Sequence, residues 1–379
     1  MWLKRLRLSH FRNYSDQTVD FHQRVNILIG ANGQGKTNLL EAIYLLGRGG
    51  TFRPGRNDKL VDRDCIGPVH AVLKASLQQG ELSSVAEVNI SPTSKTISLN
   101  GKKVSTAVLI RKNPVILFCP ESLAAIKSGP DERRTLIDEV LITHSPENSQ
   151  LLSDFRRILR QRNRLLRDLK QGSIEQREGL ALLDSINCTY FPLASQLTWS
   201  RISALRAIQP DLQNAMRTIS GLNEVDVSVD YVISGQSAID WDENQVYDAL
   251  ISRLQQLSRA EAEAGLSLVG PHKHDISFLY DKEDSRFFCS QGQQRALVLS
   301  FKMAQVMYHY RHYKDYPLLL LDDVLSELDQ DKRGNLVKFL QGIKAQIFLT
   351  TTDLSLPEDF KDTDLALFSV NSGRVQQVS

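Results

Sequence analysis

Hydrophobic and polar positions follow different periods along the chain, and residues 1–110 mostly show the two-residue period of β-strands. Leu6 and Leu8 alternate with charged residues, and Val25–Ile29 is a continuous apolar run typical of a buried strand. Lys36–Leu46 instead has helical spacing. Further β-type runs follow at Val69–Leu77, Ser84–Ile90 and Thr96–Leu99, the last before the turn signal Asn100-Gly101.

The middle of the chain, residues 111–265, has the spacing of amphipathic helices. Apolar residues recur every three or four positions at Leu151, Phe155, Ile158, Leu165 and Leu169, with Arg162 interrupting the series. This pattern predicts a short coiled-coil-like arm. Further helices are expected around 183–197 and 249–264, and a strand at 225–233.

Residues 266–379 return to alternating helix and strand. A helix near Gln293–Tyr310 precedes the apolar run Leu318–Leu321, and Ile347–Leu349 predicts another strand. The pattern predicts an α/β fold with mixed sheets. We expect one domain built from 1–110 and 266–379, interrupted by a mainly helical lobe at 111–265.

Composition and charge narrow the class of protein. Lys and Arg number 46 against 44 Asp and Glu, so any nucleic-acid binding must depend on local patches. The chain has no run of about 18 apolar residues and no continuous apolar segment near its first residue, so we expect no membrane span and no signal peptide. Four cysteines without CxxC spacing fit a reducing cytoplasm rather than disulfides or structural zinc: Cys65, Cys119, Cys188 and Cys289.

Residues 30–37 read GANGQGKT and match the phosphate-loop pattern GxxxxGK[ST]. An apolar strand precedes the loop and a helix follows it, which disfavours the alternative of a simple glycine-rich turn. Lys36 would supply a charge for the β- and γ-phosphates of ATP, and the Thr37 hydroxyl would bind Mg²⁺. The candidate nucleotide-binding residues here are Gly30, Ala31, Asn32, Gly33, Gln34, Gly35, Lys36, Thr37 and Asn38.

Two carboxylates end the leucine run 318–321. A parallel strand beside the phosphate-loop strand would place Asp322 near Mg²⁺ and Asp323 near the attacking water, so Asp323 and Lys36 are the candidate catalytic residues. Related ATPases usually have Glu at the second position. Because Asp is one methylene shorter, slow hydrolysis is expected. The alternative is a core strand with solvated acids at its end.

Residues 290–295 read SQGQQR and begin the helix before the acid strand. Ser290 is a suitable N-cap, and Gln293 completes a capping box. The segment resembles the signature of ATP-binding-cassette (ABC) ATPases, and residues 324–329 resemble their D-loop. In those ATPases the signature contacts the γ-phosphate held by the other subunit, which implies that role for Ser290, Gly292 and Gln293.

Ser290 lies 254 residues after Lys36, an intermediate insertion that resembles the RecF family among ABC-type ATPases. Transporter ATPases have shorter insertions and Rad50-like DNA tethers far longer arms; both remain alternatives, as does a clamp that binds ATP without turnover. The segments that carry the resemblance are FRNY at 11–14, FCPE at 118–121, GPDERR at 129–134 and GPHKHD at 270–275, the last departing from the family pattern at Lys273 and His274.

The resemblance implies a DNA-binding protein of recombinational repair and replication-fork recovery. It implies ATP-dependent head-to-head dimers on gapped or single-strand/double-strand junction DNA. It also implies weak DNA-stimulated ATP hydrolysis, action with RecR and RecO to load RecA, and a link to DNA damage and the SOS response. By position, Arg12 would contact nucleotide and Thr351 would replace the phosphate-sensing His of transporters, while Glu121 lies at the Q-loop position.

The predicted helix 151–170 carries seven cations and one acid from Arg156 onward. Such a row fits duplex DNA phosphates without sequence preference, although a solvated helix face is the alternative. The candidate DNA contacts are Arg156, Arg157, Arg160, Arg164, Arg167 and Lys170, with Arg162 in the same row. A second basic cluster contains Lys4, Arg5, Arg7 and Arg12.

Overall fold

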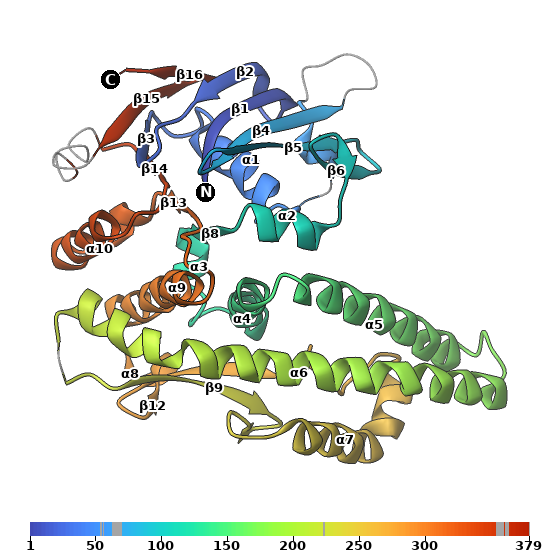
Figure 1. Ribbon diagram of the computed structural model, residues 1–379. Helices are drawn as coiled ribbons and strands as arrows, with labels where there is room; N and C mark the ends of the chain where they lie inside the picture. Colours follow the sequence, from blue (N-terminus) through green and yellow to red (C-terminus); the bar gives the residue numbers. More distant parts are fainter. Residues whose placement is uncertain are drawn as a thin grey trace. The chain divides into compact units, whose positions relative to one another are not determined.

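The computed structural model describes residues 1–53, 55, 57–62, 70–222, 224–353, 360 and 364–378 (Figure 1). Cys65, and Val69 at the start of the predicted strand 69–77, lie outside this part. The chain forms two compact units. Unit 1 contains 1–124, 214–224 and 290–379, and unit 2 contains 125–213 and 225–289.

The strands and helices of unit 1 are β1 (Trp2–Phe11), β2 (Tyr14–Asp20), β3 (Val25–Ile29), α1 (Lys36–Arg48), β4 (Ala71–Gln79), β5 (Leu82–Ile90), β6 (Lys95–Leu99), β7 (Lys102–Lys103), α2 (Thr106–Lys112), β8 (Val115–Phe118), α3 (Pro120–Leu123), α9 (Gln291–Tyr313), β13 (Leu318–Asp322), α10 (Gln330–Gly342), β14 (Ile347–Thr351), β15 (Leu365–Asn371) and β16 (Arg374–Gln377). Those of unit 2 are α4 (Pro130–His144), α5 (Asn148–Gln171), α6 (Gln176–Ser220), β9 (Val227–Ile233), β10 (Gln236–Ser237), α7 (Glu243–Ala264), β11 (Asp275–Tyr280), β12 (Glu283–Asp284) and α8 (Ser285–Phe288). The last turns of α6 belong to unit 1.

Unit 1 packs α1 between two sheets. One sheet is antiparallel, in the order β2-β1-β4-β5-β6-β7; the other has the order β16-β15-β3-β14-β13-β8 and is parallel from β15 to β8. Leu39, Leu40 and Ile43 of α1 are fully buried in one core with side chains from both sheets. Because both faces of the parallel sheet are covered, β13 and β14 are apolar runs rather than alternating ones.

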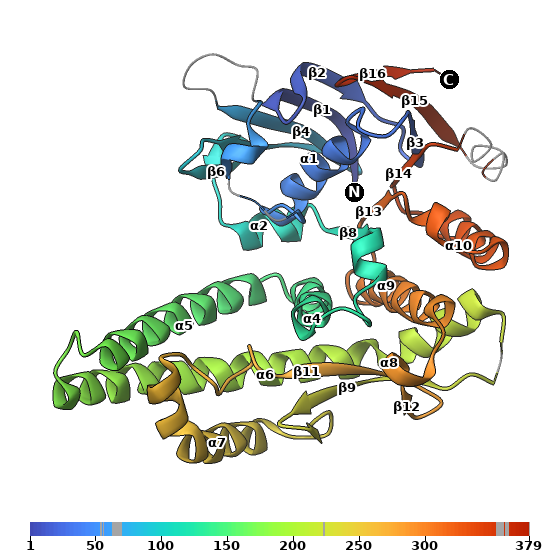
Figure 2. The same ribbon diagram turned by 180° about the vertical axis from the view of Figure 1, so that it is seen from behind.

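Unit 2 combines long helices with the antiparallel sheet β10-β9-β11-β12 (Figure 2). The expected class, an α/β fold with mixed sheets interrupted by a mainly helical lobe, is confirmed. The unit boundaries differ from the predicted division at 110 and 265. Val115–Phe118 pairs with β13 and so belongs to unit 1, whereas β11 pairs with β9 and so belongs to unit 2.

Arg162 is the residue that interrupts the apolar series of α5, and it is fully buried. Its guanidinium makes hydrogen bonds of 2.6 and 3.0 Å to Glu261 of α7, 2.9 Å to Asn187 of α6 and 2.7 Å to Ser267. It therefore joins α5, α6 and α7 from inside. Counting Arg162 in the exposed basic row was wrong, because its position on the apolar face of α5 turns it toward the other helices.

We expect Arg162→Met to destabilise unit 2 strongly, since it would leave the Glu261 carboxylate buried without its cation. Breaking such a pair costs about 3–5 kcal/mol. The control is Arg259→Met, which removes an exposed pair with Glu263 and should cost about 1 kcal/mol or less. Urea unfolding followed by circular dichroism would compare the two variants, and equal midpoint shifts would contradict the structural role of Arg162.

Candidate functional site

The loop between β3 and α1 adopts the backbone that its glycines allow. Gly33 and Gly35 have φ of 79° and 118°, in the left-handed region that favours glycine. The Lys36 ammonium folds back and donates to the carbonyls of Gly30 at 2.5 Å and Ala31 at 3.0 Å. Burial lowers the pKa of Lys36, and the charges of Asp323 and Asp322 act in the opposite direction. The lysine is thus held by its own loop, near both acids.

The FRNY segment supports this loop from the turn between β1 and β2. The Tyr14 hydroxyl donates to the Gly35 carbonyl at 2.9 Å, and Asn13 Nδ2 donates to the Gln34 carbonyl at 3.1 Å. Asn38 in turn donates to Asn13 Oδ1 at 2.8 Å. A Cβ at Gly35 would lie 2.7 Å from Asn13 Nδ2, so the contact needs glycine there.

The turn between β15 and β16 supports the same loop. Ser372 N–H donates to Gln34 Oε1 at 2.8 Å, and Gly373 N–H donates to the Gln34 carbonyl at 3.0 Å. A Cβ at Gly30 would lie 2.3 Å from the Val370 carbonyl oxygen. Sequence reasoning missed these residues, whose only local signal is the Asn-Ser-Gly turn at 371–373.

The acid pair lies where the phosphate loop meets α1. Asp322 Oδ1 accepts hydrogen bonds of 2.9 Å from the Thr37 and Thr350 hydroxyls. The fold brings these residues together because β13 and β14 are parallel neighbours, with Asp322 opposite Thr350. Burial raises the pKa of Asp322, and the hydrogen bonds from Thr37 and Thr350 oppose that rise.

The two threonines at the end of β14 make different contacts. The Thr350 hydroxyl also accepts from Asp323 N–H at 2.9 Å, whereas the Thr351 hydroxyl accepts from Asp353 N–H at 2.9 Å. Thr350, not singled out from the sequence, therefore organises both acids. Glu121, at the Q-loop position, is exposed in α3 and close enough for its charge to raise the pKa of Asp322.

Arg12 is engaged by a buried carboxylate that the sequence reasoning missed. Its guanidinium makes two 2.8 Å hydrogen bonds to Glu41 and one of 2.9 Å to the Lys59 carbonyl. Arg53 lies 4.0 Å from Glu41 and donates to Asn38 at 2.8 Å. The signal for Glu41 was an acid on the apolar face of the helix 36–46.

The signature residues lie at the start of α9. Ser290 and Gln293 form the predicted capping box, which is confirmed by reciprocal hydrogen bonds of 3.2 and 2.8 Å. Arg295 donates at 2.6 Å to the Glu327 carboxylate and joins α9 to the D-loop. Figures 1 and 2 show α9 and α1 on opposite sides of β8 and β13, so the helix that carries the signature and the helix that follows the phosphate loop cover opposite faces of the parallel sheet.

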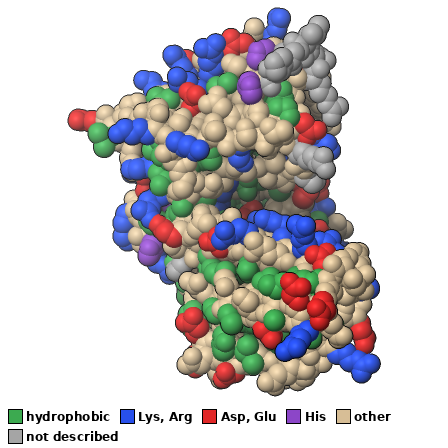
Figure 3. All heavy atoms as spheres, turned by 90° about the vertical axis from the view of Figure 1, so that its right-hand side faces the viewer, with side chains coloured by type: hydrophobic (Ala, Val, Ile, Leu, Met, Phe, Trp, Pro, Cys, Tyr) green, Lys and Arg blue, Asp and Glu red, His purple; other side chains and the backbone are tan. Residues whose placement is uncertain are grey.

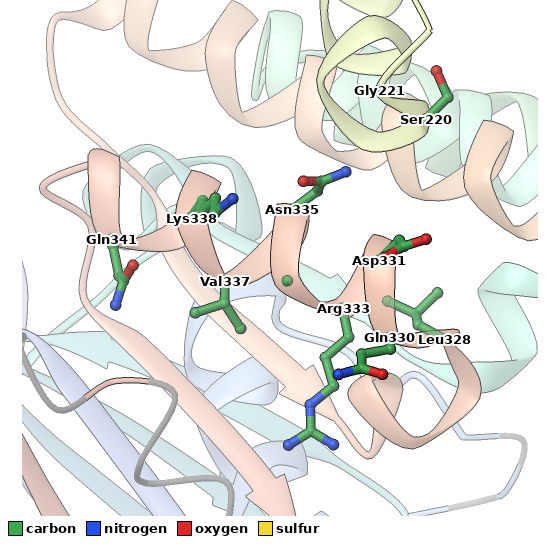
Figure 4. A pocket seen from close by; sticks show the side chains of 11 residues that line it. Ser220, Gly221, Leu328, Gln330, Asp331, Arg333, Asn335, Val337, Lys338 and Gln341 are labelled. Carbon is green, nitrogen blue, oxygen red and sulfur yellow. The ribbon is translucent and has the colours of Figure 1, made fainter.

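A separate groove of about 1240 Å³ follows the D-loop along α10 (Figure 4). Asn335 of α10 donates at 3.1 Å to the Ile219 carbonyl at the end of α6. The lining contains none of the phosphate-loop or acid-pair residues, so the groove is distinct from the candidate nucleotide site. It is lined by Ser220, Gly221, Leu328, Gln330, Asp331, Arg333, Gly334, Asn335, Val337, Lys338 and Gln341.

The basic row of α5 lies on the surface of unit 2, and Figure 3 shows a band of Lys and Arg side chains along the edge that α5 forms. Carboxylates lie 3.6 Å from Arg156, 3.0 Å from Arg157 and 4.0 Å from Arg164, whereas Arg160 and Arg167 are exposed without a described ion pair. Lys170 donates to the Ala264 carbonyl at 3.3 Å.

The second basic cluster is largely neutralised. Arg5 pairs with Asp20 at 2.6 Å, Arg7 with Asp16 at 3.2 Å, and Arg12 with Glu41. Lys4 makes no ion pair among the described residues, although its charge helps Arg5 to lower the pKa of Asp20. The α5 row is therefore the stronger candidate for DNA phosphates.

Comparison with known proteins agrees with this geometry. The model of the RecF/RecN/SMC N terminal domain family matches residues 2–375. The chain is 35% identical to the DNA replication and repair protein RecF of Heliobacterium modesticaldum over 363 residues, 93% of each chain. It is 33% identical to RecF of Bacillus cereus strain G9842 over 379 residues, 99% of this chain and 98% of the relative.

Solved structures give the same likeness. Two structures of the recombination mediator protein RecF in the RecFOR pathway, one named with ATPrS and one with ATP, superpose on this chain with TM-scores of 0.87 and 0.85 at 27% identity. Each alignment covers 100% of this chain and 98% of the other. An Smc head from Pyrococcus furiosus shares the fold, with a TM-score of 0.54 at 16% identity. Within the part of the chain that the structure describes, no helix is long and apolar enough to cross a membrane.

We expect Gly373→Ala to weaken ATP binding. Its Cβ would lie 2.0 Å from the Asn13 carbonyl oxygen at a φ of +74°, so the turn must move away from Gln34. Strain of this kind costs about 1–3 kcal/mol. The control is Gly101→Ala, which has a similar φ of +76° but nothing within 4 Å of the added Cβ. Titration with a fluorescent ATP analogue tests this, and equal affinities for both variants would contradict the supporting role of the turn.

Proposed function

The chain belongs to the RecF family, and from that premise we propose that it is an ATP-gated DNA-binding protein of replication and repair. The observation that carries the proposal is the hydrogen bond between Thr37 and Asp322, because it joins the phosphate loop to the acid strand across 285 residues of sequence. That pairing is what an ATP–Mg²⁺ site requires.

Thr37 and Asp322 are suited to Mg²⁺, which usually takes one or two protein oxygens together with phosphates and water. The metal would neutralise charge on the β- and γ-phosphates. Lys36 would leave the carbonyls of Gly30 and Ala31 for those phosphates, while the loop amides and the N terminus of α1 face them. We also propose that Arg12, which is oriented by Glu41, is a cation that contacts the nucleotide.

Asp323 is the proposed base for the attacking water. Its backbone has a φ of 52° and its N–H is held by Thr350, so its position depends on the same threonine that bonds Asp322. The short Asp side chain favours slow turnover, which suits ATP as a switch rather than a fuel. Thr351 remains the proposed γ-phosphate contact.

A second copy of the chain would complete the site. Ser290 is exposed on α9, which lies across the parallel sheet from α1, so its contact with a γ-phosphate needs the phosphate loop of another subunit. Phe287 and Phe288 precede it in the chain with 75% and 69% of their surface exposed. Apolar residues at this exposure are typical of an interface.

DNA is the proposed partner of α5. Arginines at this density suit duplex phosphates, and recognition would depend on the backbone rather than on base sequence. Gapped or junction DNA, RecR, RecO and RecA as partners, the SOS response and a cytoplasmic location follow from the family resemblance. α5 has 24 residues, about 36 Å, which is too short for a Rad50-like tether.

We expect Ser290→Arg to leave ATP binding by the monomer intact and to block ATP-driven dimers, because the added cation would clash at the other subunit's phosphates. Light scattering with ATP and nucleotide titration of the monomer measure the two properties separately. Lys36→Met is the reference variant and should lose both. Loss of monomer binding in Ser290→Arg would instead place Ser290 in its own subunit's site.

We expect Arg157→Glu, Arg160→Glu, Arg164→Glu and Arg167→Glu together to weaken duplex binding about equally for all sequences. The slope of log affinity against log salt should flatten by about one unit per lost phosphate contact. Anisotropy over a salt series measures this, with Arg253→Glu and Arg259→Glu on the exposed face of α7 as the matched control. Unchanged affinity and slope would show that the α5 row is a solvated helix face that does not bind DNA.

A further inference from the structure

Aromatic and basic residues gather at the C-terminal end of α9, in unit 1 and outside the nucleotide site. Residues 308–316 read YHYRHYKDY, in which every position except Asp315 is aromatic or basic. Asp315 is paired with the N-terminal ammonium at 2.9 Å. The segment therefore presents aromatic rings and positive charge together.

The rings form two groups of contacts. Tyr310 stacks on Tyr316 with ring centres 4.2 Å apart and planes 9° apart. The ring centre of Tyr313 lies 4.6 Å from that of His312 and 4.7 Å from that of His309. Tyr310 and Tyr313 therefore each pack against a neighbouring ring, which restricts their orientation.

Two of the tyrosine rings remain open to solvent, as does His312. Tyr310 is 38% and Tyr313 39% exposed, whereas Tyr308 of the same helix is buried. If the segment only filled the core, these large rings would be covered as Tyr308 is. A half-covered, immobilised aromatic face is suited to stacking against a flat ligand.

Positive charge surrounds the rings. Arg311 and Lys314 are exposed on the same segment, and Arg111 at the end of α2 lies close enough for its charge to act on Tyr313, lowering the pKa that burial raises. Stacked aromatic rings beside cations are the combination that binds single-stranded nucleic acid, in which unpaired bases stack and phosphates meet the cations. A duplex keeps its bases stacked inside and cannot use the rings.

We propose that the Tyr310–Tyr313 surface of α9, flanked by Arg311, Lys314 and Arg111, binds single-stranded DNA by base stacking. The inference rests on the proposed function, because it assigns a separate surface to the single strand of a gap or junction. α5 would hold the duplex through phosphates, and α9 would hold the unpaired strand through bases.

The test uses the full-length protein, a fluorescent oligothymidylate strand and a blunt duplex. Tyr310→Ala with Tyr313→Ala should weaken oligothymidylate binding about tenfold or more, since each stacked base contributes roughly 1–3 kcal/mol. Duplex affinity and ATP binding should stay at the wild-type level. Tyr310→Phe with Tyr313→Phe keeps the rings and should keep the affinity. Tyr247→Ala on α7 is the matched control, because that tyrosine is 40% exposed and should be without effect.

If the double alanine variant binds the single strand with wild-type affinity, the inference is overturned. The exposed rings would then be assigned to an interface with another protein. An equal loss of duplex binding, or a loss in the phenylalanine variant, would overturn it as well, because stacking on unpaired bases explains neither. The α5 glutamate variant distinguishes the proposed duplex site on α5 from the single-strand site on α9. It should lose duplex binding but retain oligothymidylate binding. If the α5 row proves not to bind duplex DNA, the oligothymidylate measurements would therefore still test the α9 surface.

Discussion

The hydrogen bond from Thr37 to Asp322 can form only because α1 is buried between two sheets while β13 lies two strands from β3. This packing brings the start of α1 to the edge where the parallel strands end, and both acids lie at that edge. Thr350 adds a second bond to the same carboxylate from the strand between them. A carboxylate that is buried and still accepts two hydrogen bonds is fixed in place, which the proposed role of Asp322 as a Mg²⁺ ligand requires.

The phosphate loop depends on the same architecture. The β1–β2 turn and the β15–β16 turn, at opposite ends of the sequence, both bond to the loop around Gln34 and Gly35. The loop backbone is therefore set before any nucleotide arrives. Such preorganisation reduces the cost of ordering a glycine-rich segment on binding.

Unit 2 uses buried charge for a structural purpose. Arg162 joins three helices, and Arg201 bonds Asp138 at 2.8 Å and the Pro271 carbonyl at 2.9 Å. Lys273 and His274, the two departures from the family pattern at 270–275, lie in different environments. Lys273 is exposed, whereas His274 is buried against the Tyr231 hydroxyl at 3.1 Å, and burial lowers its pKa to about 3. His274 therefore stays neutral in the folded protein near pH 7.

The sequence alone determined the α/β class, the strand before and the helix after the phosphate loop, the capping box at Ser290 and the family, because each depends on local spacing or a contiguous motif. Tertiary structure decided which hydroxyl meets the acids, since Thr350 and Thr351 are equivalent in sequence and differ only in which side of β14 they face. It also decided that Arg162 is interior and that Arg12 meets Glu41. A charge on a helix looks the same in sequence whether it faces water or another helix, and only packing distinguishes the two.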